Sequence, residues 1–174
     1  MADPARRWRR ALAGIAPIRL AGRRWYRLVS ARYRESLTSE RGAYLAGGRY
    51  NPPEQFGALY LGESPGVCRA ELARQGLRSL SRFVLGTFRV TLAKVCDLTD
   101  PSVLRALGIK RDALVQDGWL LTQQLGTRIR EAGFEAALVP SAAGPYVNLV
   151  IFTDRLGDES EVRIEDVQVA EPAT

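Results

Sequence analysis

The chain has 174 residues, of which 46% are hydrophobic and 25% charged, so it can bury one substantial core, and two independent domains would be a tight fit. Lys and Arg number 25 against 19 Asp and Glu, and the net charge of +6 favours anionic partners such as nucleotides, nucleic acids or an acidic protein. There is no histidine, which excludes Ser-His-Asp and Cys-His nucleophile pairs, histidine metal ligands and a histidine general base.

The residue pattern contains no internal repeat and predicts one α+β unit of short mixed strands with flanking helices. Ser64 and Pro65 have the types expected at the N-cap and first position of a helix that ends near Gly76. Residues 30–53 lose periodicity and predict a long loop. In chain order we expect a helix at 5–13, strands at 25–29 and 58–61, a helix at 64–76, strands at 82–90 and 94–98, a short helix from 100, a helix at 117–133, and strands at 134–139, 147–152 and 162–169, the last with a bulge.

Several features bear on location and cofactors. The two cysteines, Cys68 and Cys96, are isolated and lack CxxC spacing, which favours a reduced compartment and no metal site. The apolar run near the N-terminus is broken by Gly14, Pro17 and Arg19, so it does not fit a signal peptide, and no stretch fits a membrane span. We therefore expect a cytoplasmic protein. The arginines of helix 5–13 indicate either a solvated face or appendage, or an RNA-binding arm.

Two segments have residue types suited to an anionic ligand. Arg27 shares a face of the predicted strand with Trp25 and Val29, and an arginine among apolar neighbours favours an anion. Residues 47–52, Gly-Gly-Arg-Tyr-Asn-Pro, combine backbone freedom, the cation of Arg49 and the ring of Tyr50, which suits a nucleotide. The alternative for residues 47–52 is a Gly-rich turn with a surface arginine.

A carboxylate and a hydroxyl complete the candidates. Glu71 lies at the margin of the apolar face of the predicted helix 64–76, where it is either a catalytic group or an ordinary solvated or ion-paired glutamate. Ser141 follows Pro140 after a predicted strand, a place where serine is usually a turn residue. Neither residue alone predicts a function.

Taken together, these residues resemble those of the RES domain, a family named for an Arg, a Glu and a Ser that supplies toxins of bacterial toxin-antitoxin pairs. The family usually has Trp where this chain has Tyr50, and a smaller ring still stacks, so we expect altered affinity or substrate choice. The matching runs are Tyr26-Arg27, 38–43 (Thr-Ser-Glu-Arg-Gly-Ala), 47–52, 59–64 (Leu-Tyr-Leu-Gly-Glu-Ser), Ala70-Glu71 and 139–141 (Val-Pro-Ser).

The resemblance implies an N-terminal basic segment over residues 1–22 and a RES domain over 23–170. It also implies a fold similar to ADP-ribosyltransferases, a cleft that binds NAD as substrate, and cleavage of the bond between nicotinamide and ribose. Catalytic roles are then implied for Glu71, Arg27 and Ser141. The implied NAD-binding set is Arg27, Arg49, Tyr50, Asn51, Tyr60, Ser141 and Asn148, with the two arginines on the pyrophosphate, the two tyrosines beside nicotinamide or its ribose, and Ser141 and Asn148 on the ribose or amide.

That reaction is compatible with a chain that has no histidine, because nicotinamide leaves as a neutral base and a carboxylate can stabilise the oxocarbenium-like ribose. The acceptor of the ADP-ribosyl group can be water, phosphate or a protein side chain, so an ADP-ribosyltransferase remains an alternative. A basic RNA-binding module or RNase is a more distant one. The resemblance further implies a cognate antitoxin with a DNA-binding domain, and no direct contact of this chain with nucleic acid or a membrane.

Overall fold

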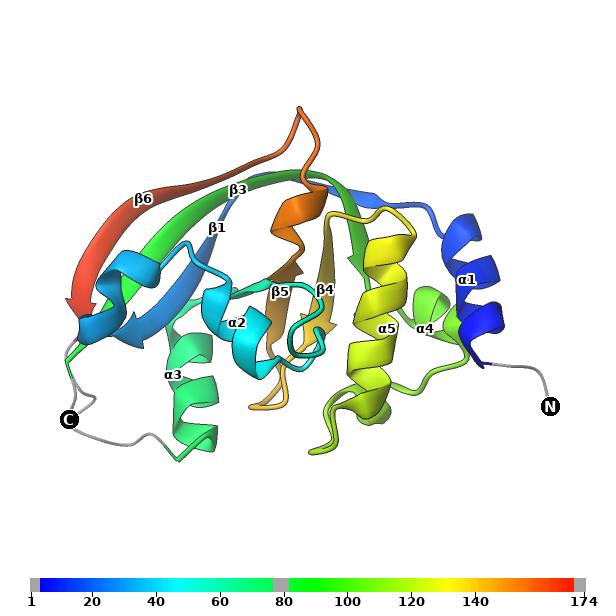
Figure 1. The fold of residues 1–174 in the computed structure, drawn as a ribbon, viewed down its shortest axis with the longest axis horizontal. Helices are drawn as coiled ribbons and strands as arrows, with labels where there is room; N and C mark the ends of the chain where they lie inside the picture. The colour runs from blue at the N-terminus through cyan, green and yellow to red at the C-terminus, as the bar shows by residue number, and fades with distance from the viewer. Residues whose placement is uncertain (1–3, 77–81, 171–174) are drawn as a thin grey trace.

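The computed structural model describes residues 4–76 and 82–170, which form a curved mixed sheet with helices on its concave side and at one end (Figure 1). The strands are β1 (Ile18–Ser30), β2 (Leu59–Gly62), β3 (Phe83–Asp97), β4 (Ala136–Pro140), β5 (Val147–Ile151) and β6 (Glu161–Ala170). The α-helices are α1 (Pro4–Gly14), α2 (Arg41–Ala46), α3 (Pro65–Arg74), α4 (Pro101–Leu107) and α5 (Leu120–Glu131), and short 3-10 turns are η1 (Ala31–Ser36), η2 (Arg111–Leu114) and η3 (Thr153–Arg155).

The strand pairings form a closed ring. The order is β1-β2-β5-β4-β3-β6, and β1 also pairs along most of β3, so five strands close a loop and β6 extends it. Among the strands of residues 4–76 and 82–170, only β3 and β4 pair in parallel. The long strands β1, β3 and β6 arch over the molecule, with α1, α4 and α5 toward the end that carries the N-terminus and α2 and α3 toward the other (Figure 1).

Two apolar clusters follow from the alternation of side chains along the central strands. In β4, Ala136 and Leu138 pack with Trp25 and Phe88 in a core between the long strands and β2, β4 and β5. Ala137 in β4 packs instead with α1, α4 and α5 in the second core. β4 is buried on both faces, which explains its continuous apolar sequence.

Several sequence predictions are confirmed. The Ser64 hydroxyl accepts the Val67 N–H at 3.3 Å and begins α3, and Pro65 is its first residue. Asp100 begins α4 in the same way, by accepting from Ser102 N–H at 2.7 Å. The register of β6 against β3 shifts between Thr87 and Phe88, which places the expected bulge in the middle of β6.

Other predictions are wrong at the element boundaries. The two strands expected at 82–90 and 94–98 are one continuous strand, β3, and β1 begins at Ile18 rather than near residue 25. The expected loop 30–53 contains η1 and α2. Helix α5 begins at Leu120, after Trp119, instead of at residue 117. For β1 and β3, the cause is that they pair with each other along most of their length, and this pairing between segments distant in sequence extends both strands.

Helix α1 exists as expected, but it is packed rather than a solvated appendage. Trp8 and Leu12 are buried at 7% and 2% exposure, and the Trp8 indole N–H donates to the Leu107 carbonyl at the end of α4 at 3.1 Å. The arginines face outward. Among the described residues no helix is both long enough and apolar enough to cross a membrane.

Candidate active site

Three of the predicted site residues, Glu71, Ser141 and Asn148, lie together where α3 meets the hairpin of β4 and β5. Ser141 directly follows β4, and Asn148 is the second residue of β5, opposite Val139. The Ser141 hydroxyl donates to Glu71 Oε1, and the Asn148 side-chain amide donates to the same oxygen at 2.8 Å. Ser141 and Asn148 thus donate to one carboxylate oxygen, although they lie 70 and 77 positions from Glu71 in the sequence.

The other oxygen of that carboxylate is available. Within the described part of the chain, Glu71 Oε2 accepts no hydrogen bond from protein. Ser141 is only 3% exposed, and its hydroxyl oxygen accepts the Ala143 N–H at 3.0 Å, so its one hydroxyl proton is directed to Glu71. The carboxylate therefore has one oxygen held by two protein donors and a second oxygen without a hydrogen bond from the described residues.

The position of α3 depends on a close approach to the sheet. A Cβ on Gly62 would lie 3.0 Å from Cys68 Sγ and 3.3 Å from Val67, so α3 packs directly on the end of β2. The Cys68 thiol donates to the Tyr26 carbonyl in β1 at 3.3 Å, and burial raises the pKa of this thiol to about 11. Cys68 is consequently neutral at physiological pH and anchors α3 to β1.

Arg27 projects from β1 toward the segment between η1 and α2. Its Nη1 donates to the carbonyls of Leu37 and Ser39 at 2.7 and 3.0 Å. No carboxylate of the described residues forms an ion pair with it, and burial lowers its pKa. A largely buried cation held only by neutral carbonyls is a suitable place for an anionic ligand.

Asn51 and Tyr60 belong to a hydrogen-bond network that holds the loop before β2. The Asn51 amide donates to the carbonyls of Ala43 and Phe56 at 2.8 and 3.0 Å, and its Oδ1 accepts the Tyr60 hydroxyl at 2.8 Å. The Tyr60 oxygen in turn accepts the Tyr50 N–H at 2.9 Å. In this structure the polar groups of Asn51 and Tyr60 therefore hold the loop, and their contact with NAD stays a prediction.

The ring of Tyr50 is also placed differently from the prediction. It is 1% exposed within the core formed with α1, α4 and α5, so it offers no face for stacking on a ligand in this structure. Its hydroxyl is buried without a hydrogen-bond partner among the described residues, and burial raises its pKa. The adjacent backbone packs against α5, where the side-chain amide of Gln123 donates to the Gly48 carbonyl at 3.0 Å.

Arg49 remains partly exposed and is held beside the segment before α5. Its Nη1 donates to the carbonyls of Leu114 and Gln116 at 3.3 and 2.6 Å, and its guanidinium lies 5.8 Å from the ring centroid of Trp119. Trp119 is 43% exposed. The structure describes no direct contact between Arg49 and Arg27 or Glu71. The predicted residues therefore form separate groups: Glu71 with its two donors, Arg27 beside the segment before α2, and Arg49 beside the segment before α5.

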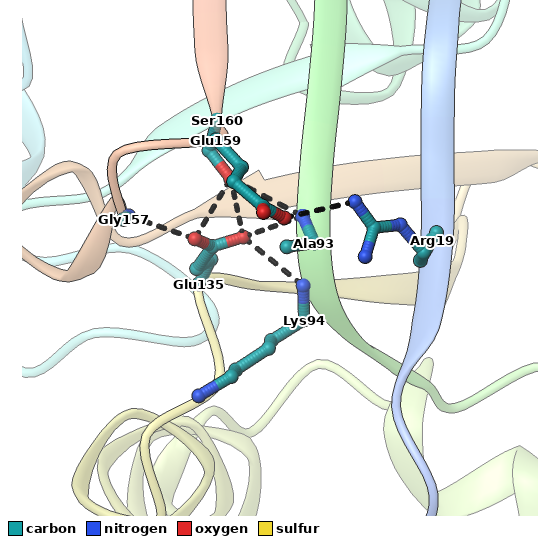
Figure 2. Close-up of polar contacts among 7 residues, drawn as sticks. All are labelled: Arg19, Ala93, Lys94, Glu135, Gly157, Glu159 and Ser160. Carbon is teal, nitrogen blue, oxygen red and sulfur yellow. Dashed lines mark hydrogen bonds and ion pairs between the residues drawn. The ribbon is translucent and has the colours of Figure 1, made fainter.

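A buried carboxylate that sequence reasoning missed is Glu135, which stands just before β4 (Figure 2). It is 3% exposed and accepts hydrogen bonds from the Ser160 hydroxyl and from the backbone N–H groups of Ala93, Lys94 and Gly157, all at 2.8 to 3.0 Å. Burial by itself raises its pKa, but these donors outweigh burial and hold the pKa below its ordinary value. The available signal was a lone charge between Phe134 and an apolar strand.

Glu135 is structural because of where its donors lie. Beyond Thr91, β3 is no longer paired with β6, and its pairing with β4 begins only at Val95. The Glu135 carboxylate satisfies N–H groups in this gap and ties the turn before β6 to it. The nearby Arg19–Glu159 ion pair is exposed (Figure 2).

Two hollows in the described surface lie against α1, away from these residues. One, of about 660 Å³, is lined by Arg6, Arg7, Arg10 and Ala106 among others, and the second, of about 330 Å³, by Arg7, Lys110 and Leu121 among others. Neither is lined by a predicted site residue. Residues 4–76 and 82–170 contain no group of three or more side chains able to hold a metal ion.

Comparison with known proteins gives one consistent relationship. The chain is 34% identical, over 134 residues covering 72% of it and 70% of the relative, to NAD(+) phosphorylase MbcT of Mycobacterium tuberculosis, and equally to that of Mycobacterium bovis. The structure is similar to a chain in the crystal structure of the M. tuberculosis MbcT-MbcA toxin-antitoxin complex, with a TM-score of 0.84, 27% identity, and coverage of 98% of this chain and 95% of that one. The model of the RES domain matches residues 24–171, and the chain therefore belongs to the RES domain family.

Proposed function

We propose that this protein is a toxin of a toxin-antitoxin pair that cleaves NAD+ at the bond between nicotinamide and ribose, with phosphate as the acceptor. The observation that carries the proposal is the Glu71 carboxylate, oriented by Ser141 and Asn148 with one oxygen left over, in a chain similar over most of its length to an NAD(+) phosphorylase. The match to a chain of a toxin-antitoxin complex supports the toxin part and an antitoxin partner.

Cleavage of the bond between nicotinamide and ribose requires a negative charge beside the ribose ring. As the C–N bond breaks, its electron pair leaves with neutral nicotinamide, and positive charge develops on the ribose ring. Glu71 Oε2 would stabilise that charge, and a phosphate oxygen would then bond to the same ribose carbon to give ADP-ribose 1″-phosphate. No general base is required to release nicotinamide, which agrees with the absence of histidine.

The two arginines would bind different parts of the substrate's phosphate groups. Arg27, whose guanidinium has no carboxylate partner among the described residues, would bind a phosphate group of the substrate. Arg49 would contact the pyrophosphate from the side of Trp119. Asn51 and Tyr60 would act indirectly, by holding the loop that carries Arg49.

Two broader expectations are part of the proposal. The RES domain would occupy residues 23–170, with the basic segment 1–22 contributing α1 as an addition packed on α4 and α5, and the fold would be of the ADP-ribosyltransferase type. The antitoxin would carry the DNA-binding domain, so the basic charge of this chain would serve substrate and partner rather than DNA.

The test is product analysis by mass spectrometry after incubation of the purified protein with NAD+, with and without inorganic phosphate, and then with a cell lysate. We expect free nicotinamide and ADP-ribose 1″-phosphate when phosphate is present. ADP-ribose in phosphate-free buffer would make water the acceptor. NAD+ loss only with lysate, together with a protein that gains the mass of ADP-ribose, would favour the transferase alternative, and no loss in any condition would overturn the proposal.

A further inference from the structure

The two donors on Glu71 differ in how the structure constrains them. Ser141 is buried, and its oxygen already accepts the Ala143 N–H, so its hydroxyl has little freedom. Asn148 is only partly buried, and its amide donates to Glu71 Oε1 at 2.8 Å, the one hydrogen bond that its side chain makes among the described residues. A residue in that position could contact either the substrate or the carboxylate, and here it contacts the carboxylate.

The backbone that carries Asn148 is anchored on the same side of the site. The Val147 N–H donates to Glu63 Oε1 at 2.8 Å, and the Glu63 N–H donates to the Val147 carbonyl at 3.2 Å. Glu63 directly precedes Ser64, the N-cap of α3, and α3 carries Glu71. These two hydrogen bonds join the start of β5 to the start of α3. They lie one residue before Asn148 in β5 and about two helical turns before Glu71 in α3.

We propose that Asn148 is a positioning residue that fixes the plane of the Glu71 carboxylate through Oε1, so that Oε2 points to the substrate, and that it does not bind NAD+ itself. This inference rests on the proposed function. It differs from the role that the family resemblance implies for Asn148, a hydrogen bond to the ribose or the amide of NAD+. The physical basis is that two donors on one oxygen remove rotation of the carboxylate, which an isolated Glu side chain keeps.

The experiment compares Asn148→Ala, Asn148→Leu, which has a similar shape and no charge, Glu71→Ala and the double variant Glu71→Ala/Asn148→Ala. The matched control is Gln168→Ala, because Gln168 is an exposed amide that donates to Asp166 at 2.6 Å on β6, away from the site. We would measure kcat and KM with NAD+ and phosphate, the Kd of NAD+ by calorimetry and the Tm of each variant.

A positioning role predicts that both Asn148 variants lower kcat about 10- to 100-fold, the loss expected for one hydrogen bond to a charged group, while the Kd of NAD+ stays within about 2-fold of wild type. In the Glu71→Ala background, Asn148→Ala should change neither residual turnover nor Kd. Gln168→Ala should match wild type.

A direct substrate contact would instead weaken NAD+ binding in both backgrounds, and that result would overturn the inference. Unchanged kcat in a folded Asn148→Ala variant would overturn it as well. If Asn148→Ala alone loses the native Tm, Asn148→Leu keeps the test in force, because it nearly preserves the shape, removes the donor and adds no charge beside Glu71. A wild-type protein with no NAD+ turnover would overturn the proposed function, which is a separate outcome.

Discussion

The backbones of Gly126 and Tyr50 meet without room for a side chain: a Cβ on Gly126 would lie 1.9 Å from the Tyr50 carbonyl oxygen. Gly126 is in the interior of α5, and Tyr50 belongs to the loop that carries Arg49. This contact, with the Gln123 amide on the Gly48 carbonyl, holds the loop against the helix. A glycine in mid-helix is unfavourable by intrinsic propensity, so its presence here is explained by the approach of the loop.

Gly126→Ala is expected to destabilise the protein by about 1–3 kcal/mol, because overpacking against a backbone carbonyl outweighs the gain in helix propensity of up to about 1 kcal/mol. Urea unfolding at neutral pH measures the difference. Gly118→Ala is the control, since a Cβ there would meet nothing within 4 Å. A stabilised Gly126→Ala protein would show that the loop moves away easily.

Glu71→Gln is expected to keep the fold and most of the NAD+ affinity while lowering kcat by about 100-fold or more, because it removes the charge that stabilises the transition state and keeps the shape of the site. Steady-state kinetics and calorimetry separate the two effects. Glu131→Gln, on the exposed side of α5, is the control. Full turnover by Glu71→Gln would exclude the proposed role of this carboxylate.

Arg49→Ala is expected to weaken NAD+ binding by roughly 1.5–3 kcal/mol, the value of a hydrogen bond to a charged group. Because Arg49 also donates to the carbonyls of Leu114 and Gln116, the Tm of the variant is measured together with its Kd. Arg163→Ala, an exposed arginine of β6, serves as the control. Unchanged affinity in the Arg49 variant would place the pyrophosphate elsewhere.

Glu135→Gln is expected to destabilise the protein by about 1.5–3 kcal/mol at pH 7. The backbone N–H groups that now donate to the carboxylate would then face the NH2 group of the glutamine, which cannot accept their hydrogen bonds. The pKa of Glu135 is lowered in the folded state, so its contribution is fully present above the pKa of the unfolded chain and is lost as pH falls through the folded value. The gap between wild type and variant in urea unfolding should thus narrow from pH 7 to pH 3.

The matched control for that experiment is Glu159→Gln, whose carboxylate is exposed and paired with Arg19 (Figure 2). Its substitution should change stability by less than about 1 kcal/mol. A gap between wild type and Glu135→Gln that stays constant over the whole pH range would mean that shape, and not charge, makes Glu135 important.

Local sequence was sufficient to predict an element where a single residue type has a strong backbone preference or where a strand is apolar on both faces. Ser64 and Asp100, each followed by proline, begin helices where expected, and the apolar residues of β4 form the central strand. The family motifs contain Glu71 and Ser141, and Asn148 was named with the NAD-binding set that the resemblance implies. The structure places both Ser141 and Asn148 in hydrogen-bond contact with Glu71.

The tertiary structure decided which of the candidate side chains are covered or bonded by other parts of the chain. From sequence alone, Tyr50, Asn51 and Tyr60 were candidates for ligand binding, because residue type does not show whether a ring or an amide lies in a core or in a cleft. Their roles depend on whether other parts of the chain cover the ring and bond to the polar atoms. Here the core formed with α1, α4 and α5 covers the Tyr50 ring, and the Asn51 amide donates to the carbonyls of Ala43 and Phe56. Glu135 was missed for the matching reason, since its four partner residues come from β3 and from the turn before β6. Residue type and spacing determine which chemistry is present, whereas hydrogen bonds between distant segments determine which groups remain free for a substrate.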